Sequence, residues 1–515
     1  MRKLLKVSLC FWLIFLAPAF SSLAKEFKVL RWAADAESNA PYIFQDPKIP
    51  SNIIGFEVDI VNAIADVLGV QTHFVQNQWD GLIPGLYRGD YDIAINGLEI
   101  TEDRKKEVNF SKPYYITHEQ LVVLKGVNYI YSLSDLVGRK VGALKNSLAE
   151  RILRAKGGIN VLTYEGEVNA FVDMKNGRID AVLVDAPIAI YYTAVNPEFE
   201  MVGQPIGEIS YGIAVRKEDT LLLQELNYAI DVIQRNGKLR EILDSWNLWN
   251  FMMETYLNDF APTNVPPKKY QYFVESVSQK SRFTERIELY LKFMPVFFEA
   301  ALITLGLSFV AMLFAIFAGL IIALLRIYGG KILSWFAVAY IEIIRGTPLL
   351  IQLYLIFYAL PSIGIKLSPF LAAVLGLGLN YAAYEAEVYR SGFFAIPKGQ
   401  MEAAISLGMS KFQAIRYVIF PQTIRIVIPP VTNDFISLLK DSSLVSVITM
   451  VELTKVYNQI ASTYYDYLGT GIITAVLYLL LGLPFIRIAR YFERRLAVER
   501  KPPKIKNNIY NSLSF

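Results

Sequence analysis

Five long apolar segments in the second half of the chain most constrain its fold. They occupy residues 296–325, 333–360, 369–389, 424–439 and 467–486. The first contains an uncharged run longer than the roughly 20 residues that a helix needs to cross the hydrocarbon of a bilayer. We therefore expect an all-α transmembrane domain of about five spans over residues 296–495, embedded in a lipid membrane.

The composition supports a membrane protein and excludes several other classes. Hydrophobic residues make up 54% and charged residues 19% of the 515 residues, and the mean hydropathy is +0.34. A net charge of +4 is too small to indicate a nucleic-acid partner. Cys10 is the single cysteine, and the sequence has no loop ending in Gly-Lys-Ser/Thr that could cradle phosphates. We expect no metal, no cofactor, no ATP site and no enzymatic constellation.

Basic residues follow alternate apolar segments and predict the orientation of the domain. If the spans alternate, three basic clusters fall on one side, which the excess of Lys and Arg marks as the cytoplasm. The clusters are Arg326 with Lys331; Arg390, Lys398, Lys411, Arg416 and Arg425; and Arg487, Arg490, Arg494 and Arg495. The loop at 390–421 and the tail at 496–515 are then cytoplasmic.

The first 24 residues have the pattern of an export signal. Arg2, Lys3 and Lys6 form a positive start, residues 7–20 are apolar, and small residues at 22–24 suit a cleavage site. An uncleaved anchor helix is the alternative. In both cases the chain from Lys25 onward is delivered outside the cytoplasm.

Residues 25–250 have the alternating pattern of an α/β domain. Short β-rich runs at 27–33, 72–76, 92–95 and 121–124 alternate with helical patterns such as 57–68. A second set of strands follows at 140–144, 180–184 and 211–215, and two helices at 221–235 and 238–246 return to the first set. Two sets indicate two lobes, and the cleft between such lobes is a natural ligand site.

Several stretches of this domain resemble the extracellular solute-binding proteins for polar amino acids, which have a two-lobed clamshell fold. They cover most of the domain in that family's order. The stretches are Ala40-Pro41-Tyr42, residues 55–59, Trp79 with 82–84, residues 96–104, residues 110–114 and residues 180–185.

The resemblance implies a set of ligand-binding residues. Arg104 matches the arginine that holds the ligand α-carboxylate, and a guanidinium suits that group because it can bind it with two hydrogen bonds. Asp185 matches the carboxylate that holds the ammonium. Tyr42 and Trp79 match an aromatic pair whose faces favour a cation. The remaining expected contacts come from the backbone at Gly97 and Ser147, from Glu99, and from Asp35 and Glu37 in a ligand-facing loop of the first lobe.

Two departures from the family pattern concern the ligand. Glu99 stands where Thr or Ser is common, and Asn146-Ser147 replaces Gly-Thr. Together with Asp35 and Glu37, Glu99 makes the expected pocket acidic, which favours a basic amino acid. Glu99 could instead hold the ammonium, which would leave the side-chain end neutral and suited to glutamine.

Residues 251–295 are expected to link the two domains. Ala261-Pro262-Thr263 and Val265-Pro266-Pro267 predict an extended, semi-rigid spacer. Residues 270–293 alternate charges and aromatics at near-helical spacing, which is typical of a helix lying on the outer membrane surface or of a charged helix in solvent.

A basic, amphipathic stretch at 401–421 lies between two apolar segments. Glu402 suits the first turn of a helix, Gly408 would permit close approach of another backbone, and Pro421 is expected to end the unit. Glu402-Ala403-Ala404, Gly408 and residues 418–421 resemble the cytoplasmic loop of ABC importer permeases. In that family the loop forms the coupling helix that docks on a separate cytosolic ATPase subunit, so these residues are the expected coupling residues.

The apolar half as a whole resembles the permeases of the polar amino acid branch, through residues 345–350 and 440–444. Asp434 and Asp441 lie seven residues apart, on one helical face, and acidic residues at membrane depth usually serve a substrate path. Alternatively, Asp441 sits at the outer end and pairs with Lys440. Glu385 and Glu387 are expected to reach toward the cytoplasmic surface.

These observations together predict a receptor fused to the permease subunit of an ATP-driven amino acid importer in a bacterial cell (inner) membrane. The permease should pair with a second copy. A ligand-gated channel is a remote alternative, because its pore would interrupt the receptor between the lobes. A sensor would need a cytoplasmic output domain, for which the segment 497–515 is too short.

Overall fold

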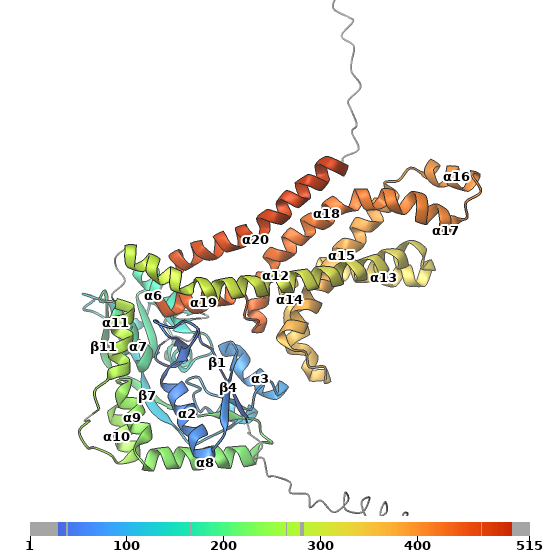
Figure 1. Ribbon diagram of the computed structural model, residues 1–515. Coiled ribbons are helices and arrows are strands. Elements are labelled where there is room, and N and C mark those ends of the chain that lie inside the picture. Colours follow the sequence, from blue (N-terminus) through green and yellow to red (C-terminus); the bar gives the residue numbers. More distant parts are fainter. Residues whose placement is uncertain are drawn as a thin grey trace, which may run out of the picture.

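The computed structural model of the protein describes residues 29–37, 40–164, 166–263, 265–278, 283–464 and 466–496. The signal expected at 1–24 and almost all of the tail expected at 496–515 lie outside these ranges. An α/β part stands at one end of a long helical part (Figure 1). This is the expected combination of a two-lobed domain and an all-α domain.

The first lobe is built on a five-stranded sheet in the order β4-β1-β5-β12-β6. Strand β1 pairs in parallel with β4 and β5, while β12 is antiparallel to its neighbours. The strands are β1 (Val29–Ala34), β4 (Gln71–Gln76), β5 (Ile93–Ala94), β6 (Asn109–Phe110) and β12 (Ala214–Val215). The helices of this lobe are α2 (Phe56–Leu68), α3 (Leu82–Arg88), α4 (Glu102–Glu107), α8 (Thr220–Arg235) and α9 (Lys238–Ser245), and β2 (Phe44–Gln45) with β3 (Ile53–Ile54) form a small hairpin.

The second lobe is built on a sheet in the order β11-β7-β10-β8-β9. Its strands are β7 (Tyr115–Leu124), β8 (Lys140–Leu144), β9 (Asn160–Tyr164), β10 (Ala181–Asp185) and β11 (Phe199–Tyr211), and its helices are α5 (Leu148–Lys156), α6 (Glu167–Lys175) and α7 (Ala186–Val195). The strand expected at 211–215 is divided, because β11 ends in this sheet and β12 begins in the other. The chain therefore crosses between the lobes at Gly212-Ile213.

Two further helices follow α9 in the chain. They are α10 (Phe251–Leu257) and α11 (Lys268–Ser278). Phe273 of α11 is 1% exposed. Its ring centroid lies 5.5 Å from that of Phe44 and 5.1 Å from that of Tyr191. The expectation of a membrane-surface or solvent-exposed helix is wrong for α11, because its aromatic face packs into the core of the α/β part.

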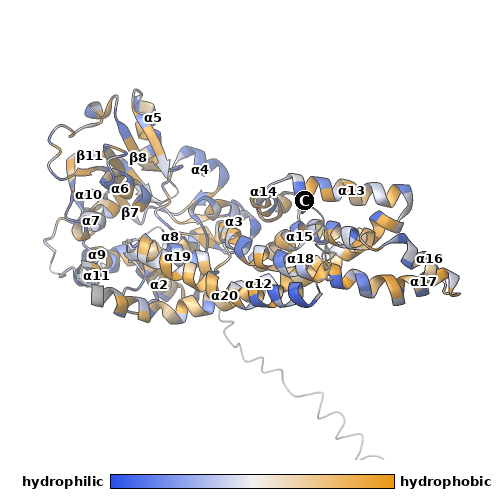
Figure 2. Cartoon of the chain, turned by 90° about the horizontal axis from the view of Figure 1, so that it is seen from above, coloured by the Kyte–Doolittle hydropathy of each residue, from blue (hydrophilic) through white to orange (hydrophobic). Residues whose placement is uncertain are grey.

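The helical part begins with α12 (Phe283–Tyr328), the longest helix among the described residues. It continues with α13 (Gly330–Gly346), α14 (Leu349–Tyr354), α15 (Pro369–Phe394), α18 (Phe420–Asp441), α19 (Leu453–Tyr464) and α20 (Tyr467–Leu496). Helix α12 packs along α15, and α20 packs along α18. Apolar residues are spread along these helices (Figure 2).

Among the described residues, 287–328 and 467–495 form helices long and apolar enough to cross a membrane. A third span results if α13 and the helix at 349–359 count as one, although they are bent by 106°. The continuous span expected at 333–360 is thus broken. Pro348 is the N-cap of α14 and has no N–H to continue the preceding helix. Helices α15 and α18 cover two further expected spans but contain several charged residues each and are less apolar.

We predict that Phe273→Ala destabilises the α/β part although Phe273 lies outside the segment expected to form it. Removing a buried aromatic ring leaves a cavity and should lower the free energy of unfolding by about 3–5 kcal/mol. Thermal unfolding of the full chain in detergent, followed by tryptophan fluorescence, measures the loss. Leu221→Ala is the control, since Leu221 is 69% exposed and should change stability by no more than about 0.5 kcal/mol. Equal effects of the two substitutions would contradict the packing role of α11.

Candidate ligand-binding site and coupling loop

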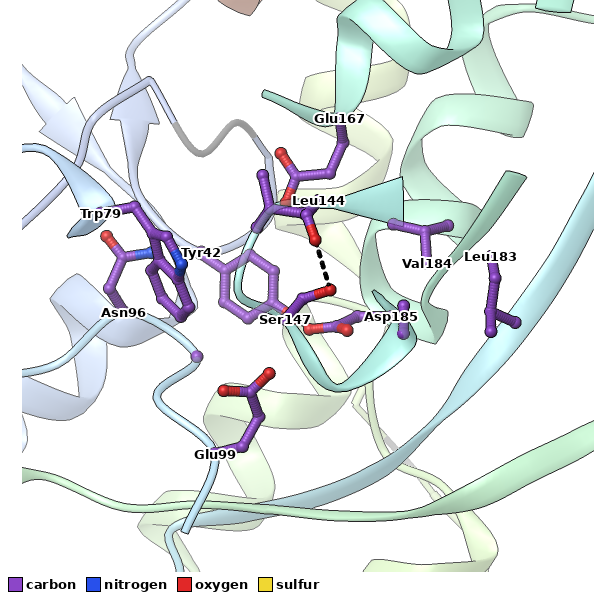
Figure 3. Close-up of a pocket in the computed structure, with 12 residues that line it drawn as sticks. Tyr42, Trp79, Asn96, Glu99, Leu144, Ser147, Glu167, Leu183, Val184 and Asp185 are labelled. Atoms are coloured by element: carbon purple, nitrogen blue, oxygen red, sulfur yellow. Dashed lines mark hydrogen bonds between the residues drawn. The ribbon is translucent and has the colours of Figure 1, made fainter. Parts of the chain in front are cut away.

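A polar pocket lies between the two lobes, where residues from both sheets meet. Its lining comprises Tyr42, Trp79, Asn96, Gly97, Glu99, Leu144, Ser147, Ala149, Glu167, Leu183, Val184 and Asp185. Three carboxylates, of Glu99, Glu167 and Asp185, converge beside Tyr42 (Figure 3). The free space measures about 30 Å³, which is much less than an amino acid needs. An amino acid can therefore enter only when the lobes or the lining side chains move.

The end of β10 positions Asp185, one of these three carboxylates. Asp185 is the N-cap residue of α7, and its Oδ2 accepts a hydrogen bond of 2.9 Å from the Tyr42 hydroxyl, across the cleft. The Tyr211 hydroxyl donates to the same oxygen. Burial raises the pKa of Asp185, although the two tyrosines and the neighbouring Glu119 oppose the shift. Burial also raises the pKa of Glu119, so this pair of acids retains a proton more readily than exposed carboxyl groups do.

An ion pair between Arg104 and Glu99 occupies the other side of the pocket. The carboxylate of Glu99 also accepts a 3.0 Å hydrogen bond from the backbone N–H of Leu148, at the first turn of α5 in the opposite lobe. The guanidinium of Arg104 lies 5.3 Å from the ring centroid of Trp79. Glu99 thus fills the position that a ligand carboxylate would need in order to reach both Arg104 and the helix N-terminus.

Local structure explains why small residues stand at two of the expected site positions, Ser147 and Gly97. Ser147 caps α5, since its Oγ accepts from Glu150 N–H at 3.3 Å while its hydroxyl donates to the Leu144 carbonyl at 2.7 Å. Gly97 has φ +59°, and a Cβ there would lie 3.0 Å from the ring of Tyr42. The N–H of Gly97 donates to Glu57 at 2.6 Å, so this N–H is already used within the protein, and a ligand contact from the Gly97 backbone stays a prediction.

Asp35 and Glu37 are absent from the lining of this pocket and serve other contacts. The carboxylate of Asp35 accepts hydrogen bonds from Trp79 N–H at 3.0 Å and from Gln76 Nε2 at 2.9 Å, and so positions the aromatic residue. Glu37 forms an ion pair of 2.8 Å with Lys455 in the helical part. The structure therefore brings together Tyr42, Trp79, Gly97, Glu99, Ser147 and Asp185 and places Arg104 beside them. Asp35 and Glu37 line an adjoining cavity that shares Trp79, Leu144 and Glu167 with the pocket.

Sequence reasoning missed Glu167, which enters the pocket from the first turn of α6. Burial, together with repulsion from Asp185 and Asp35, raises the pKa of Glu167 to about 8. No motif marked this residue, because a glutamate at the start of a helix is common on any protein surface.

The structure bears on two expectations about the acidic residues of the helical part: the alternative pairing of Asp441 with Lys440, and the position of Glu385. Asp441 accepts a 2.7 Å hydrogen bond from the Tyr381 hydroxyl, whereas Lys440 is exposed. Glu385 is fully buried, so the expectation that it reaches the membrane surface is wrong. Whether Asp434 and Asp441 line a substrate path stays a prediction.

The loop expected to couple to an ATPase forms two short helices at the end of the molecule away from the α/β part (Figures 1 and 2). They are α16 (Lys398–Ser406) and α17 (Lys411–Ala414), and Gly408 between them has φ +84°. Nothing lies within 4 Å of a Cβ built at Gly408, so within this chain the glycine serves the turn, with no close approach of another backbone.

Glu402 and Ala403 are exposed in this loop, while Ala404 is buried. Pro421 does not end the unit as expected, because a π-helical turn at Ile415–Ile419 leads directly into α18. Large apolar side chains are unusually exposed here, with Leu407 at 81% and Phe412 at 71%.

Comparison with known proteins gives two matches in the expected order. Residues 30–248 match the bacterial extracellular solute-binding proteins of family 3, and residues 315–498 match the inner membrane component of binding-protein-dependent transport systems. The glutamine transport system permease protein GlnP of Escherichia coli (strain K12) is 37% identical over 206 residues, which are 40% of this chain and 94% of that protein. The chain belongs to the permeases of amino acid ABC transporters.

Other permeases of this family match the same half of the chain. The L-cystine transport system permease protein TcyB of Bacillus subtilis (strain 168) is 37% identical over 209 residues, or 40% of this chain and 88% of that protein. The solved structure titled "An ancestral arginine-binding protein bound to glutamine" is 37% identical, with a TM-score of 0.41, over 43% of this chain and 98% of that one. The two family matches and the permease relatives identify an amino acid ABC permease with a solute-binding domain fused at its N-terminus.

We predict that Arg104→Ala abolishes amino acid binding by this permease. The ligand α-carboxylate would lose its cationic partner, and Glu99, which is 3% exposed, would keep no guanidinium beside it. The dissociation constant, measured by calorimetry on the full chain in detergent, should rise by about a hundredfold or more.

Lys106→Ala is the matched control, because Lys106 lies on the same helix α4, is exposed and pairs with Asp103. Binding by the Arg104 variant within a few-fold of the unmodified chain would show that another group holds the carboxylate.

Proposed function

We propose that the chain is the membrane subunit of an ATP-driven importer, which captures a polar, basic L-amino acid with its tethered domain and passes it through the permease domain. The observation that supports a basic ligand is the excess of acid at the pocket: three carboxylates line it, while Arg104 supplies the adjacent cation. Burying a second cationic group next to these acids is favourable, whereas an acidic ligand side chain would add repulsion.

The second candidate is the same importer with specificity for glutamine or glutamate. Two observations favour a neutral ligand side chain. The ion pair with Arg104 already neutralises Glu99, and the raised pKa of Glu167 leaves that group largely protonated at neutral pH. Relatives named for glutamine and for L-cystine match the permease half about equally well, so similarity in that half does not choose between ligands.

The orientation and the partners belong to the same proposal. The binding domain faces the extracytoplasmic side, and the loop at 390–421 faces the cytoplasm, in line with the basic clusters on that side. A cytosolic ABC ATPase docks on this loop, whose exposed Leu407 and Phe412 are the kind of apolar surface that a partner covers. A second copy of the chain completes the permease.

We predict that affinity for a basic amino acid rises with pH and that Glu167 causes the rise. The pKa of Glu167 is about 8, so the group gains its negative charge as pH increases from 6 to 8.5, and a cationic ligand should bind more tightly. The slope can reach at most about tenfold per pH unit for one proton. Calorimetry with arginine and glutamine at several pH values measures it.

Glu167→Gln is expected to remove the slope for arginine and to leave glutamine affinity almost unchanged. Glu150→Gln serves as the control, since this glutamate lies in the first turn of a second-lobe helix, accepts from the Asn146 N–H and is absent from the pocket lining. A pH slope that persists in the Glu167 variant would exclude Glu167 as the titrating group, and equal losses for both ligands would favour glutamine.

We also predict that Gly408→Asp uncouples transport from ATP hydrolysis while membrane insertion and amino acid binding stay intact. A side chain at this exposed turn would stand between the loop and the ATPase, and overpacking typically costs about 1–3 kcal/mol. Reconstitution with the ATPase measures co-purification, ligand-stimulated hydrolysis and uptake. Gly364→Asp is a matched control, because Gly364 also has positive φ (+86°) and open space around its Cβ. Normal uptake by the Gly408 variant would mean that this loop does not couple.

A further inference from the structure

Helix α19 of the permease domain contacts the first lobe of the binding domain at three points along its length. Lys455 pairs with Glu37 at 2.8 Å, Gln45 Nε2 donates to Gln459 Oε1 at 3.3 Å, and the Tyr464 hydroxyl donates to the Pro47 carbonyl at 2.6 Å. Positions 455 and 459 lie one helical turn apart, so the contacts follow the helix axis. All three partners in the binding domain belong to the first lobe.

Lys455 is held rigidly where it meets the lobe. Its backbone N–H donates to the carboxylate of Glu452 at 2.9 Å, at the start of α19. Glu452 in turn accepts from the Tyr478 hydroxyl at 2.9 Å, and the backbone N–H of Leu453 donates to Thr304 at 3.1 Å. The base of α19 is therefore fixed to α12 and α20, and the ammonium is presented by a supported element.

The ion pair between Lys455 and Glu37 is largely buried, so each charge depends on the other. The Lys455 side chain is 0% exposed and that of Glu37 is 20% exposed. Asp35 adds a second negative charge near the ammonium. An ammonium that is buried this deeply must keep its partner, because removing one member of a buried pair leaves an uncompensated charge. Docking of the lobe is thus tied to the presence of both charges.

A second region of the permease touches the same lobe. The guanidinium of Arg88, at the end of α3, lies 4.2 Å from the ring centroid of Phe357 and 5.1 Å from that of Tyr358. Nearby, Lys366 Nζ donates to the Tyr87 carbonyl at 3.4 Å. Two separated contacts fix the orientation of the lobe as well as its position.

The connection between the domains favours docking within one chain. Helix α11 is packed into the binding domain, and α12 begins five peptide steps after its last residue, Ser278. These steps span at most about 18 Å. A tether this short keeps the effective concentration of the lobe high at its own permease domain and restricts its reach to another copy.

The docked surface also lies beside the ligand cleft. A cavity of about 190 Å³ is lined by both lobes and by Asn458, Ser462 and Tyr467 of the permease domain. It shares Trp79, Leu144 and Glu167 with the ligand pocket. These three residues therefore lie between the ligand pocket and a cavity that the permease helices also line.

We propose that the permease domain docks its own binding domain by the first lobe, through the ion pair of Lys455 on α19 with Glu37. This inference rests on the proposed importer function and adds the surface and the lobe that are used. The second lobe then opens and closes the cleft against an anchored first lobe, beside α19.

Thiol cross-linking of the full chain tests the proposal in the absence of amino acid. Gln45→Cys and Gln459→Cys are introduced together in a Cys10→Ser background, and a short bifunctional maleimide links them when the lobe is docked. Lys455→Glu or Glu37→Lys alone should lower the rate of cross-linking about tenfold. The double variant Lys455→Glu with Glu37→Lys should restore most of it, and this restoration guards against loss of folding in the single variants.

Glu208→Lys is the matched control, because Glu208 is an exposed carboxylate on β11 of the second lobe. The proposal is overturned if the single reversals cross-link at the unmodified rate, if the double variant fails to recover, or if the product is a covalent dimer instead of an internally linked monomer. Amino acid binding is measured separately on the same samples. A chain that binds no amino acid but shows this cross-linking pattern would refute the importer function and leave the docking inference standing.

Discussion

The short connection between α11 and α12 is the constraint on which the arrangement of the two domains depends. Phe273 anchors α11 in the aromatic core of the binding domain, and α12 begins the permease domain almost at once. The residues that connect α10 to α11 lie before α11 and so do not lengthen the tether. The binding domain is therefore held close to the permease domain. Its orientation is set by contacts between the two domains, because no long linker allows it to diffuse away.

Within the binding domain, charge complementarity closes the cleft. Glu99 links Arg104 in its own lobe with the first turn of α5 in the other, and Asp185 links the second lobe to Tyr42. Protein groups thus make the same kinds of contact that an amino acid would make with its carboxylate and its ammonium. A ligand must replace these contacts, so its affinity reflects a difference between two sets of hydrogen bonds.

The sequence predicted the two-lobed domain, the helical domain and most of the pocket, because periodic patterns and ordered motifs determine them locally. It could not place Asp35 and Glu37, because their partners, Trp79 N–H and Lys455, are 44 and 418 residues away along the chain. Glu167 was missed because only the closure of two lobes brings it to the pocket. The interpretation of α11 failed because an amphipathic helix shows which face is apolar but leaves open whether lipid or protein covers it.

The small volume of the ligand pocket has a consequence for the kinetics of capture. A space of about 30 Å³ admits no amino acid, so each binding event waits for the cleft to open. At low ligand concentration the observed association constant is the intrinsic one multiplied by the open fraction. At high concentration the rate of capture levels off at the rate of opening, well below the diffusion limit. The frequency of cleft opening would then set the highest rate at which the binding domain can supply ligand to the permease domain.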